Sequence, residues 1–338
     1  MLRCALLTLF ALFCVAVAQG QTDSTKVYRG TLGDKHIEMR LNVTGAKVSG
    51  TYFYDQFRQD ITLEGAYDPK GALQLVEGTG KKKTGKFVCK AEPESIEADL
   101  ECDWSRPDGK GQAFVYLTEQ GIRFKSDIKI VPKIVSDRKT KAYGSLPQVA
   151  TPVLTPGMIS LNKLIESKVM AAMKDFDPEE VANSSYDTNY NVMWATDDII
   201  SLEFDEYSDV GAAHPNTRLW TINYNLKTNK QLTLADVFTP NSNYVTEVAK
   251  FVTKDINRRA DKLDEDEARR NNTPLQKRHD PVMTEDGLPD MDTWALTPKG
   301  FAAYFDFPHV MAVFDKTIVP YGMLARYLRA DGVVPMVR

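Results

Sequence analysis

The chain has 338 residues, of which 43% are hydrophobic and 26% are charged, and its formal net charge is −4. This length predicts about two domains, and the composition lies near the globular average, which excludes a disordered chain, a collagen and a long coiled coil. The slight acidity disfavours a dedicated nucleic-acid-binding protein. With four Cys and four His, a clustered metal site is not expected, and neither is a cofactor.

Residues 1–20 have the features of a cleavable export signal. Arg3 provides the positive start, an apolar run follows over 6–17, and Ala16-Val17-Ala18 supplies the small residues of a cleavage site. This run is too short to span a membrane, and no later run is longer. The mature chain is therefore expected to be exported to the periplasm or the extracellular medium, without a membrane span.

Export determines how the cysteines are interpreted, because Cys4 and Cys14 leave with the signal and only Cys89 and Cys102 remain. Two cysteines in an oxidising compartment predict one disulfide, which closes a loop of about 14 residues and stabilises by roughly 3 kcal/mol. The alternative is a pair of buried free thiols. The strand pattern indicates a turn near Pro93, which leaves an offset pairing open.

Residues 21–123 are expected to form a first domain, an antiparallel β-meander closed as a barrel or a sandwich. Apolar and polar residues alternate over 37–43 and 96–104, as strands with one buried face require. Shorter strands are predicted at 51–54, 61–63, 73–75, 87–89 and 114–117, with Gly- and Pro-containing turns between them.

Residues 124–338 are expected to form an α+β domain with a mostly antiparallel sheet and two main helices. One helix begins after the N-cap Thr155 and extends to Phe176; the other begins at Tyr244 and acquires a strongly charged tail over 261–270. Strands are predicted around 186–194, 200–204, 220–226, 294–296, 301–307 and 317–321, a long exposed loop over 271–292, and a short helix through Leu324 and Leu328.

No catalytic motif is complete. His279-Asp280 has no nucleophile in a matching motif, and Gly144-Ser145-Leu146-Pro147 does not fit the Gly-x-Ser-x-Gly pattern. Asp286, Asp290 and Asp292 could contact calcium, but their spacing differs from that of an EF-hand, which favours a solvated acidic loop.

The segment from Glu203 to Thr217 is more distinctive and is expected to join two strands. Negative charge gathers before a compact turn of small residues, after which His214 precedes a proline that favours an extended conformation. A structural histidine is one interpretation and a functional one the other. The candidate binding residues are Glu203, Asp205, Glu206, Asp209, Gly211, Ala212, Ala213, His214, Pro215 and Asn216.

Dispersed motifs over about 124–330 resemble a bacterial extracytoplasmic domain of unknown function. They are Tyr143 with Leu146-Pro147-Gln148, Asn162 with Ile165, 211–215, 232–238, Phe301 with Tyr304-Phe305, and Val319-Pro320-Tyr321 with Leu324. In that family the domain is the sensor portion of lysozyme-responsive anti-sigma factors and also precedes a peptidoglycan deacetylase domain. The sigma-binding segment, the membrane span and the deacetylase domain of those relatives have no counterpart in this sequence.

The resemblance implies binding rather than catalysis. The expected function is that of an exported, non-catalytic binding module of the bacterial cell envelope, which recognises a basic protein such as a lysozyme-type hydrolase, or a peptidoglycan fragment. The alternative is an envelope hydrolase acting on peptidoglycan or acetylated glycans, with His214 as its catalytic residue.

The cysteine argument predicts that the exported chain contains no free thiol. Titration of the unreduced, denatured protein with a thiol reagent is expected to detect no reactive thiol, because Cys89 and Cys102 are bonded in an oxidising compartment. The same titration after reduction serves as the control. Two reactive thiols per unreduced chain would contradict the prediction.

Overall fold

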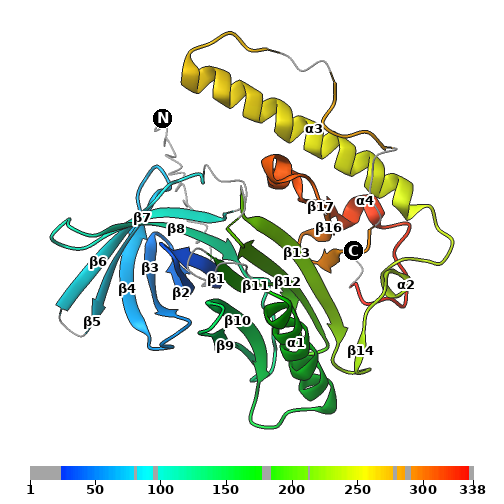
Figure 1. Ribbon diagram of the computed structural model, residues 1–338, viewed down its shortest axis with the longest axis horizontal. Helices are drawn as coiled ribbons and strands as arrows, with labels where there is room; N and C mark the ends of the chain where they lie inside the picture. The colour runs from blue at the N-terminus through cyan, green and yellow to red at the C-terminus, as the bar shows by residue number, and fades with distance from the viewer. Residues whose placement is uncertain are drawn as a thin grey trace, which may run out of the picture.

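The N-terminal part of the chain is a closed eight-stranded antiparallel barrel, drawn in blue to cyan in Figure 1. The computed structural model describes residues 24–79, 82–93, 98–176, 184–211, 214–276, 280–285 and 291–334, so the expected export signal lies outside it. Each strand pairs with its neighbour in the chain and β1 closes the barrel against β8. The strands are β1 (Ser24–Leu32), β2 (Lys35–Thr44), β3 (Lys47–Tyr54), β4 (Ile61–Tyr67), β5 (Leu73–Thr79), β6 (Lys82–Cys89), β7 (Leu100–Ser105) and β8 (Gln112–Glu119). The predicted meander is confirmed, and it adopts the barrel form.

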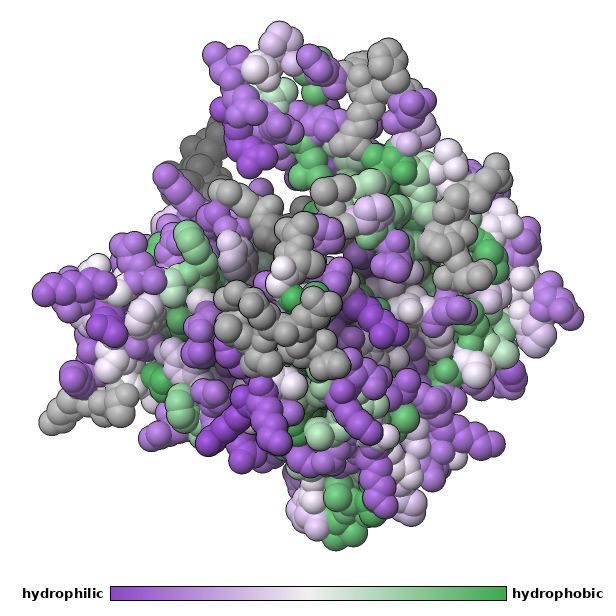
Figure 2. All heavy atoms as spheres, in the orientation of Figure 1, coloured by the Kyte–Doolittle hydropathy of each residue, from purple (hydrophilic) through white to green (hydrophobic). Residues whose placement is uncertain are grey.

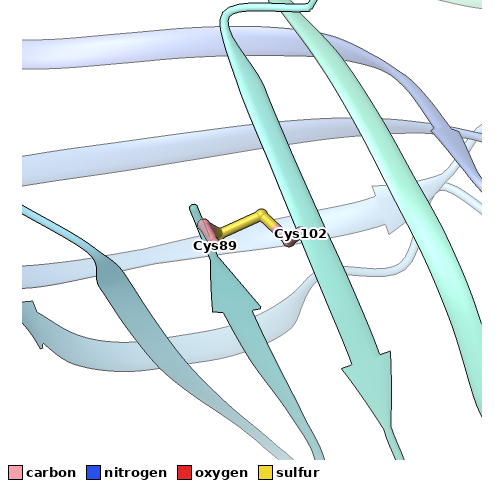
Figure 3. Close-up of a disulfide and its surroundings, with 2 residues drawn as sticks. All are labelled: Cys89 and Cys102. Atoms are coloured by element: carbon pink, nitrogen blue, oxygen red, sulfur yellow. A yellow bond between two sulfur atoms is a disulfide. The ribbon is translucent and has the colours of Figure 1, made fainter. Parts of the chain in front are cut away.

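The disulfide joins β6 to β7. Cys89 and Cys102 are bonded, as predicted, and they stand directly opposite one another in the strand pairing (Figure 3). An offset pairing is therefore not adopted. The ladder over 86–89 and 102–105 fixes the register independently of the loop that follows Cys89, and part of that loop (94–97) lies outside the described residues.

A six-stranded sheet follows the barrel in the order β14-β13-β12-β11-β10-β9. Its strands are β9 (Lys129–Asp137), β10 (Ala142–Ala150), β11 (Ser185–Ala195), β12 (Ile199–Asp209), β13 (Asn216–Asn225) and β14 (Lys230–Gln231). All pairs are antiparallel except β10 with β11. Strands β9 and β10 are not predicted from the sequence. They contain Pro132 and Pro147, which face each other in the register, and proline usually interrupts strands.

Helix α1 (Pro156–Asp175) connects the parallel strands β10 and β11 and covers one face of this sheet. It begins as predicted, because the Thr155 hydroxyl accepts a hydrogen bond of 3.3 Å from the amide of Met158. Asn162 fixes the helix to β10: its amide accepts from the Val149 N–H at 2.8 Å and donates to the Val149 carbonyl at 2.9 Å. Apolar burial and one satisfied polar contact thus hold the helix on the sheet.

A small three-stranded sheet and the second main helix complete the fold. The elements are α2 (Leu234–Val237), α3 (Tyr244–Asn271), β15 (Trp294–Leu296), β16 (Gly300–Tyr304), a 3-10 helix (His309–Phe314), β17 (Lys316–Pro320) and α4 (Tyr321–Leu324). Their order along the chain confirms the predicted α+β class. Strand β16 ends earlier than predicted, because the Phe305 amide donates to the Asp315 carbonyl outside the sheet. Helix α4 also ends earlier than predicted, because Leu328 forms a β-bridge with Phe238 rather than a further helical turn.

Helix α3 buries side chains only as far as Ala260. Val248, Val252 and Ile256 are buried beside the three-stranded sheet, whereas the charged tail after Ala260 contains no buried residue. The hydrophilic spheres at the top of Figure 2 lie over this helix. Among the described residues, no helix combines the length and the apolar character needed to cross a bilayer.

Arg29 joins the barrel to the six-stranded sheet and is only 1% exposed. On the barrel side its guanidinium contacts Asp55 at 2.6 Å and Glu38 at 3.4 Å. On the sheet side it donates to the side-chain oxygen of Asn189 at 3.2 Å and to the Tyr190 carbonyl at 3.3 Å. Arg29 lies on the outer side of the barrel wall, in the contact with the six-stranded sheet. Its charge can be buried there because Asp55 and Glu38 neutralise it.

Glu203 joins the six-stranded sheet to the three-stranded sheet in a similar way. Its carboxylate accepts hydrogen bonds from the Tyr304 hydroxyl at 2.6 Å, the Lys316 ammonium at 3.0 Å and the Asn191 amide at 3.0 Å. Burial by itself would raise the pKa of Glu203, but the charge of Lys316 and these hydrogen bonds outweigh burial and lower it. Glu203 is therefore ionised and paired inside the protein.

Replacing Arg29 by Met is expected to destabilise the protein by about 3–5 kcal/mol, because Asp55 and Glu38 lose the partner that compensates their burial. Denaturant unfolding measures the change. The matched control is Lys227→Met, which removes an ion pair to Asp198 that is 74% and 57% exposed, and no measurable change is expected there. Equal effects of the two substitutions would contradict the structural role of Arg29.

Replacing Glu203 by Gln is expected to destabilise the protein by about 1–3 kcal/mol at pH 7, because the pairing with Lys316 is lost. A carboxylate with a lowered pKa contributes stability above its unfolded pKa of about 4.3 and loses it as the pH falls through the lower, folded value. The difference between the two proteins should therefore shrink between pH 5 and pH 3 in denaturant unfolding. Asp205→Asn, on the same strand but exposed, is the control. A difference that does not change with pH would contradict the prediction.

Candidate functional site

The distinctive segment forms the hairpin between β12 and β13, so the predicted strand–turn–strand arrangement is confirmed. The turn covers 210–215, of which Ala212 and Ala213 lie outside the described residues. Gly211 has a φ of +81°, a left-handed conformation that favours glycine. No described atom lies within 4 Å of where its Cβ would be. The backbone conformation therefore explains the glycine at this position, and no close approach of a described backbone atom does.

The acidic residues of β12 divide between the interior and the surface. Glu203 and Glu206 are 3% and 9% exposed, and Glu206 accepts a hydrogen bond of 3.1 Å from the Tyr186 hydroxyl. Asp205 is exposed and Asp209 is half-buried. Of these four candidate binding residues, Glu203 and Glu206 are enclosed by neighbouring elements, and Asp205 and Asp209 are the ones that solvent reaches.

Three successive outward positions of β12 define what we call the acidic strip: Asp205, Tyr207 and Asp209. Tyr207 is 37% exposed between the two carboxylates, and Asp209 also closes the turn by accepting from the Gly211 amide at 2.8 Å. The alternation of the strand places these side chains on one face, the face that also carries Glu203. The strip offers two negative charges around an aromatic ring.

His214 and its neighbours lie beside the acidic strip. The His214 ring is exposed, and its Nδ1 lies 3.1 Å from the carbonyl oxygen of Pro215. Asn216 begins β13 and pairs with Ser208. Among the described residues, no group of three or more His, Cys, Asp or Glu side chains is placed to hold a metal ion. The structure describes only part of the loop that is expected over 271–292, and His279, Asp286 and Asp290 lie outside the described residues.

A second site was not predicted from the sequence: a pocket of about 220 Å³ between the barrel and the six-stranded sheet. The β1–β2 turn and the end of β3 form its barrel side, and β10 and β11 form its sheet side. The lining residues are Asp34, Lys35, His36, Tyr54, Gln56, Tyr143 and Asp187. We call it the junction pocket.

His36 crosses the junction. Its Nε2 lies 2.7 Å from the Asp187 carboxylate, and its ring stacks on Tyr143 with centroids 5.9 Å apart and planes inclined by 16°. Burial, assisted by Asp55 and Asp187, raises the pKa of Tyr143, so its phenol stays protonated at neutral pH. The pocket therefore combines flat rings with hydrogen-bonding groups.

The junction pocket has no sequence signature because its residues come from four separate strand ends. Of the lining residues, the sequence indicates only Tyr143, as part of the family resemblance. A weak signal was available in Asp34-Lys35-His36, which combines three polar residues directly after the Gly33 turn. The position of these residues in a turn, however, does not indicate which strands of the sheet will face them.

Comparison with known proteins identifies a domain family in the C-terminal part of the chain. Residues 235–313 match the family model described as "Protein of unknown function (DUF3298)". No curated protein matches the chain. A crystal structure of a DUF3298 family protein from Pseudomonas aeruginosa is similar, with 16% identity, coverage of 60% of this chain and 94% of that one, and a TM-score of 0.39.

A crystal structure of a DUF3298 family member from Bacteroides fragilis is similar at the same level. Its identity is 13%, the coverage is 61% of this chain and 93% of that one, and the TM-score is 0.38. These values transfer no function. The similarity to a family is therefore limited to residues 235–313, which match a domain family of unknown function.

Proposed function

We propose that the protein is an exported, non-catalytic binding module of the bacterial cell envelope. It recognises a basic partner, of which a lysozyme-type hydrolase is the best specific candidate, through the acidic strip of β12. The expected signal at residues 1–20 and the resemblance to lysozyme-responsive sensor domains support the location and the partner class.

The observation that carries the proposal is the order Asp205, Tyr207, Asp209 on one exposed face. Carboxylates at an interface rim attract a basic partner over long distances and raise the association rate. Tyrosine is among the residues that contribute most to binding energy when a partner covers them. The strip supplies both kinds of contact on one rigid strand, which neighbouring strands hold on both sides.

Surface plasmon resonance with immobilised protein and a basic lysozyme in solution tests the proposal. Asp209→Lys should slow association, most at low salt, and Asp209→Asn should do so less, because Asn keeps an acceptor for the Gly211 amide. Tyr207→Ser should mainly speed dissociation. The control Glu265→Lys makes the same change of charge at an exposed position on α3 and should alter association less than Asp209→Lys.

Two outcomes would reject parts of the proposal. If the wild-type protein does not bind lysozyme at low salt, lysozyme is rejected as the partner. If the Asp209, Tyr207 and Glu265 variants have equal kinetics, the binding site does not lie on β12. Turnover of peptidoglycan or acetylated glycans that His214→Ala abolishes would replace the binding role by the hydrolase alternative.

A further inference from the structure

We propose that the junction pocket binds one neutral sugar ring. The pocket lies between the barrel and β10–β11 and takes no part in the contacts assigned to the acidic strip. Asp187 does pair with Tyr207 across β11 and β12, so the two sites are neighbours on one sheet. The inference concerns a different ligand and does not depend on the partner of the strip.

The size of the pocket limits the ligand. Its volume of about 220 Å³ lies below the range of roughly 300–1,000 Å³ that is usual for drug-sized ligands. A single six-membered ring with its substituents is of the right order, whereas a peptide or a nucleotide is too large to be enclosed. Longer chains could enter only with one terminal ring.

The charges of the pocket favour a neutral ligand. Asp34 forms an ion pair with Lys35 at 2.8 Å, and Asp187 pairs with His36 at 2.7 Å. Each carboxylate thus already faces a donor, and the one lysine faces a carboxylate. The Asp34–Lys35 pair is 83% and 55% exposed and contributes little. The pair that a ligand ion would disturb is that of His36 and Asp187, which a neutral ligand leaves in place.

The hydrogen-bonding groups suit hydroxyls, which both donate and accept. The Asp187 side chain uses Oδ1 for His36 and keeps 38% of its surface exposed. Gln56 is exposed at the rim and offers an amide, which can donate and accept. The protonated Tyr143 phenol adds a further hydroxyl.

His36 forms part of the pocket wall. Its side chain is 10% exposed, and its Nε2 lies 2.7 Å from the Asp187 carboxylate. This contact holds the Asp187 side chain in one place, so that its exposed surface can accept a hydrogen bond from a ligand hydroxyl.

Aromatic rings supply the apolar part of the recognition. Tyr54 and Tyr143 both line the pocket and are half-buried. The ring of a sugar has C–H faces that pack on such side chains, while its hydroxyls point outward to polar groups. Few ligand classes other than sugars present an apolar face and a ring of hydroxyls within this volume.

Saturation-transfer NMR on the full mature protein is the direct test. The probes are glucose, galactose, mannose and N-acetylglucosamine, with glycerol as a hydroxyl control without a ring and with ethanolamine and acetate as charged controls. At least one sugar should give a signal and the controls should give none. Titration of that sugar then measures its Kd.

Variants place the binding in the junction pocket. Gln56→Ala changes an exposed side chain, so the protein should keep its wild-type melting temperature, and it should bind the sugar at least about fivefold more weakly through loss of a hydrogen bond. Asp187→Asn should weaken binding as well. Gln59→Ala is the matched control, because Gln59 is exposed on the same loop but does not line the pocket, and binding should be unchanged.

The inference is overturned if no sugar binds, if ethanolamine or acetate binds instead, or if Gln56→Ala and Gln59→Ala bind the sugar equally well. Asp209→Lys separates the two proposals. It should leave the Kd for the sugar unchanged, whether or not the protein binds lysozyme.

Discussion

The arrangement of the molecule depends on the buried guanidinium of Arg29. Two carboxylates of the barrel, Asp55 and Glu38, neutralise it, and the second is also paired with Arg40 at 2.6 Å. The sheet contributes polar groups, including the Ser145 hydroxyl, which donates to Asp55 at 2.5 Å. A buried cluster of charges gains little net free energy, since desolvation offsets the attraction. Its contribution is to fix one orientation, because any other would leave an ion unpaired.

That orientation creates the junction pocket. His36 follows the β1–β2 turn of the barrel, whereas Asp187 and Tyr143 stand side by side at the register of β10 and β11. Arg29 helps to hold the two units at the distance and angle at which His36 contacts Asp187, together with the hydrogen bonds that Gln120 and Gly121 form with β11. The pocket is thus a product of the interface and belongs to neither unit alone.

Glu203 has a corresponding role on the other side of the six-stranded sheet. It places Lys316 of β17 and Tyr304 of β16 against β11 and β12. Its burial also determines which acidic residues of β12 are left for an interaction. One face of a strand can be covered near one end and exposed to solvent near the other. The face of β12 that carries Glu203 is exposed after this residue, where the acidic strip begins.

The types of most elements can be predicted from local patterns in the sequence. Period-two alternation predicted most of the barrel strands, the Thr155-Pro156 start predicted α1, and helical spacing predicted α3 with its charged tail, because these patterns are local and reflect one buried face. The cysteine pair was also predictable, since it follows from an even count in an oxidising compartment. Strands β9 and β10 were missed because Pro132 and Pro147 occur within them.

How these elements pack against one another follows from long-range contacts, which the local patterns do not contain. In the sequence, Arg29, Glu38 and Asp55 are ordinary surface charges on alternating strands, and their burial follows from the sheet that covers them. Glu203 and Asp205 share one strand face, yet one is enclosed by Tyr304 and Lys316 and the other is exposed. His36 and Asp187 are 151 residues apart in the chain. A local pattern carries no information about such a contact, because it is set by packing between units rather than by the periodicity of either.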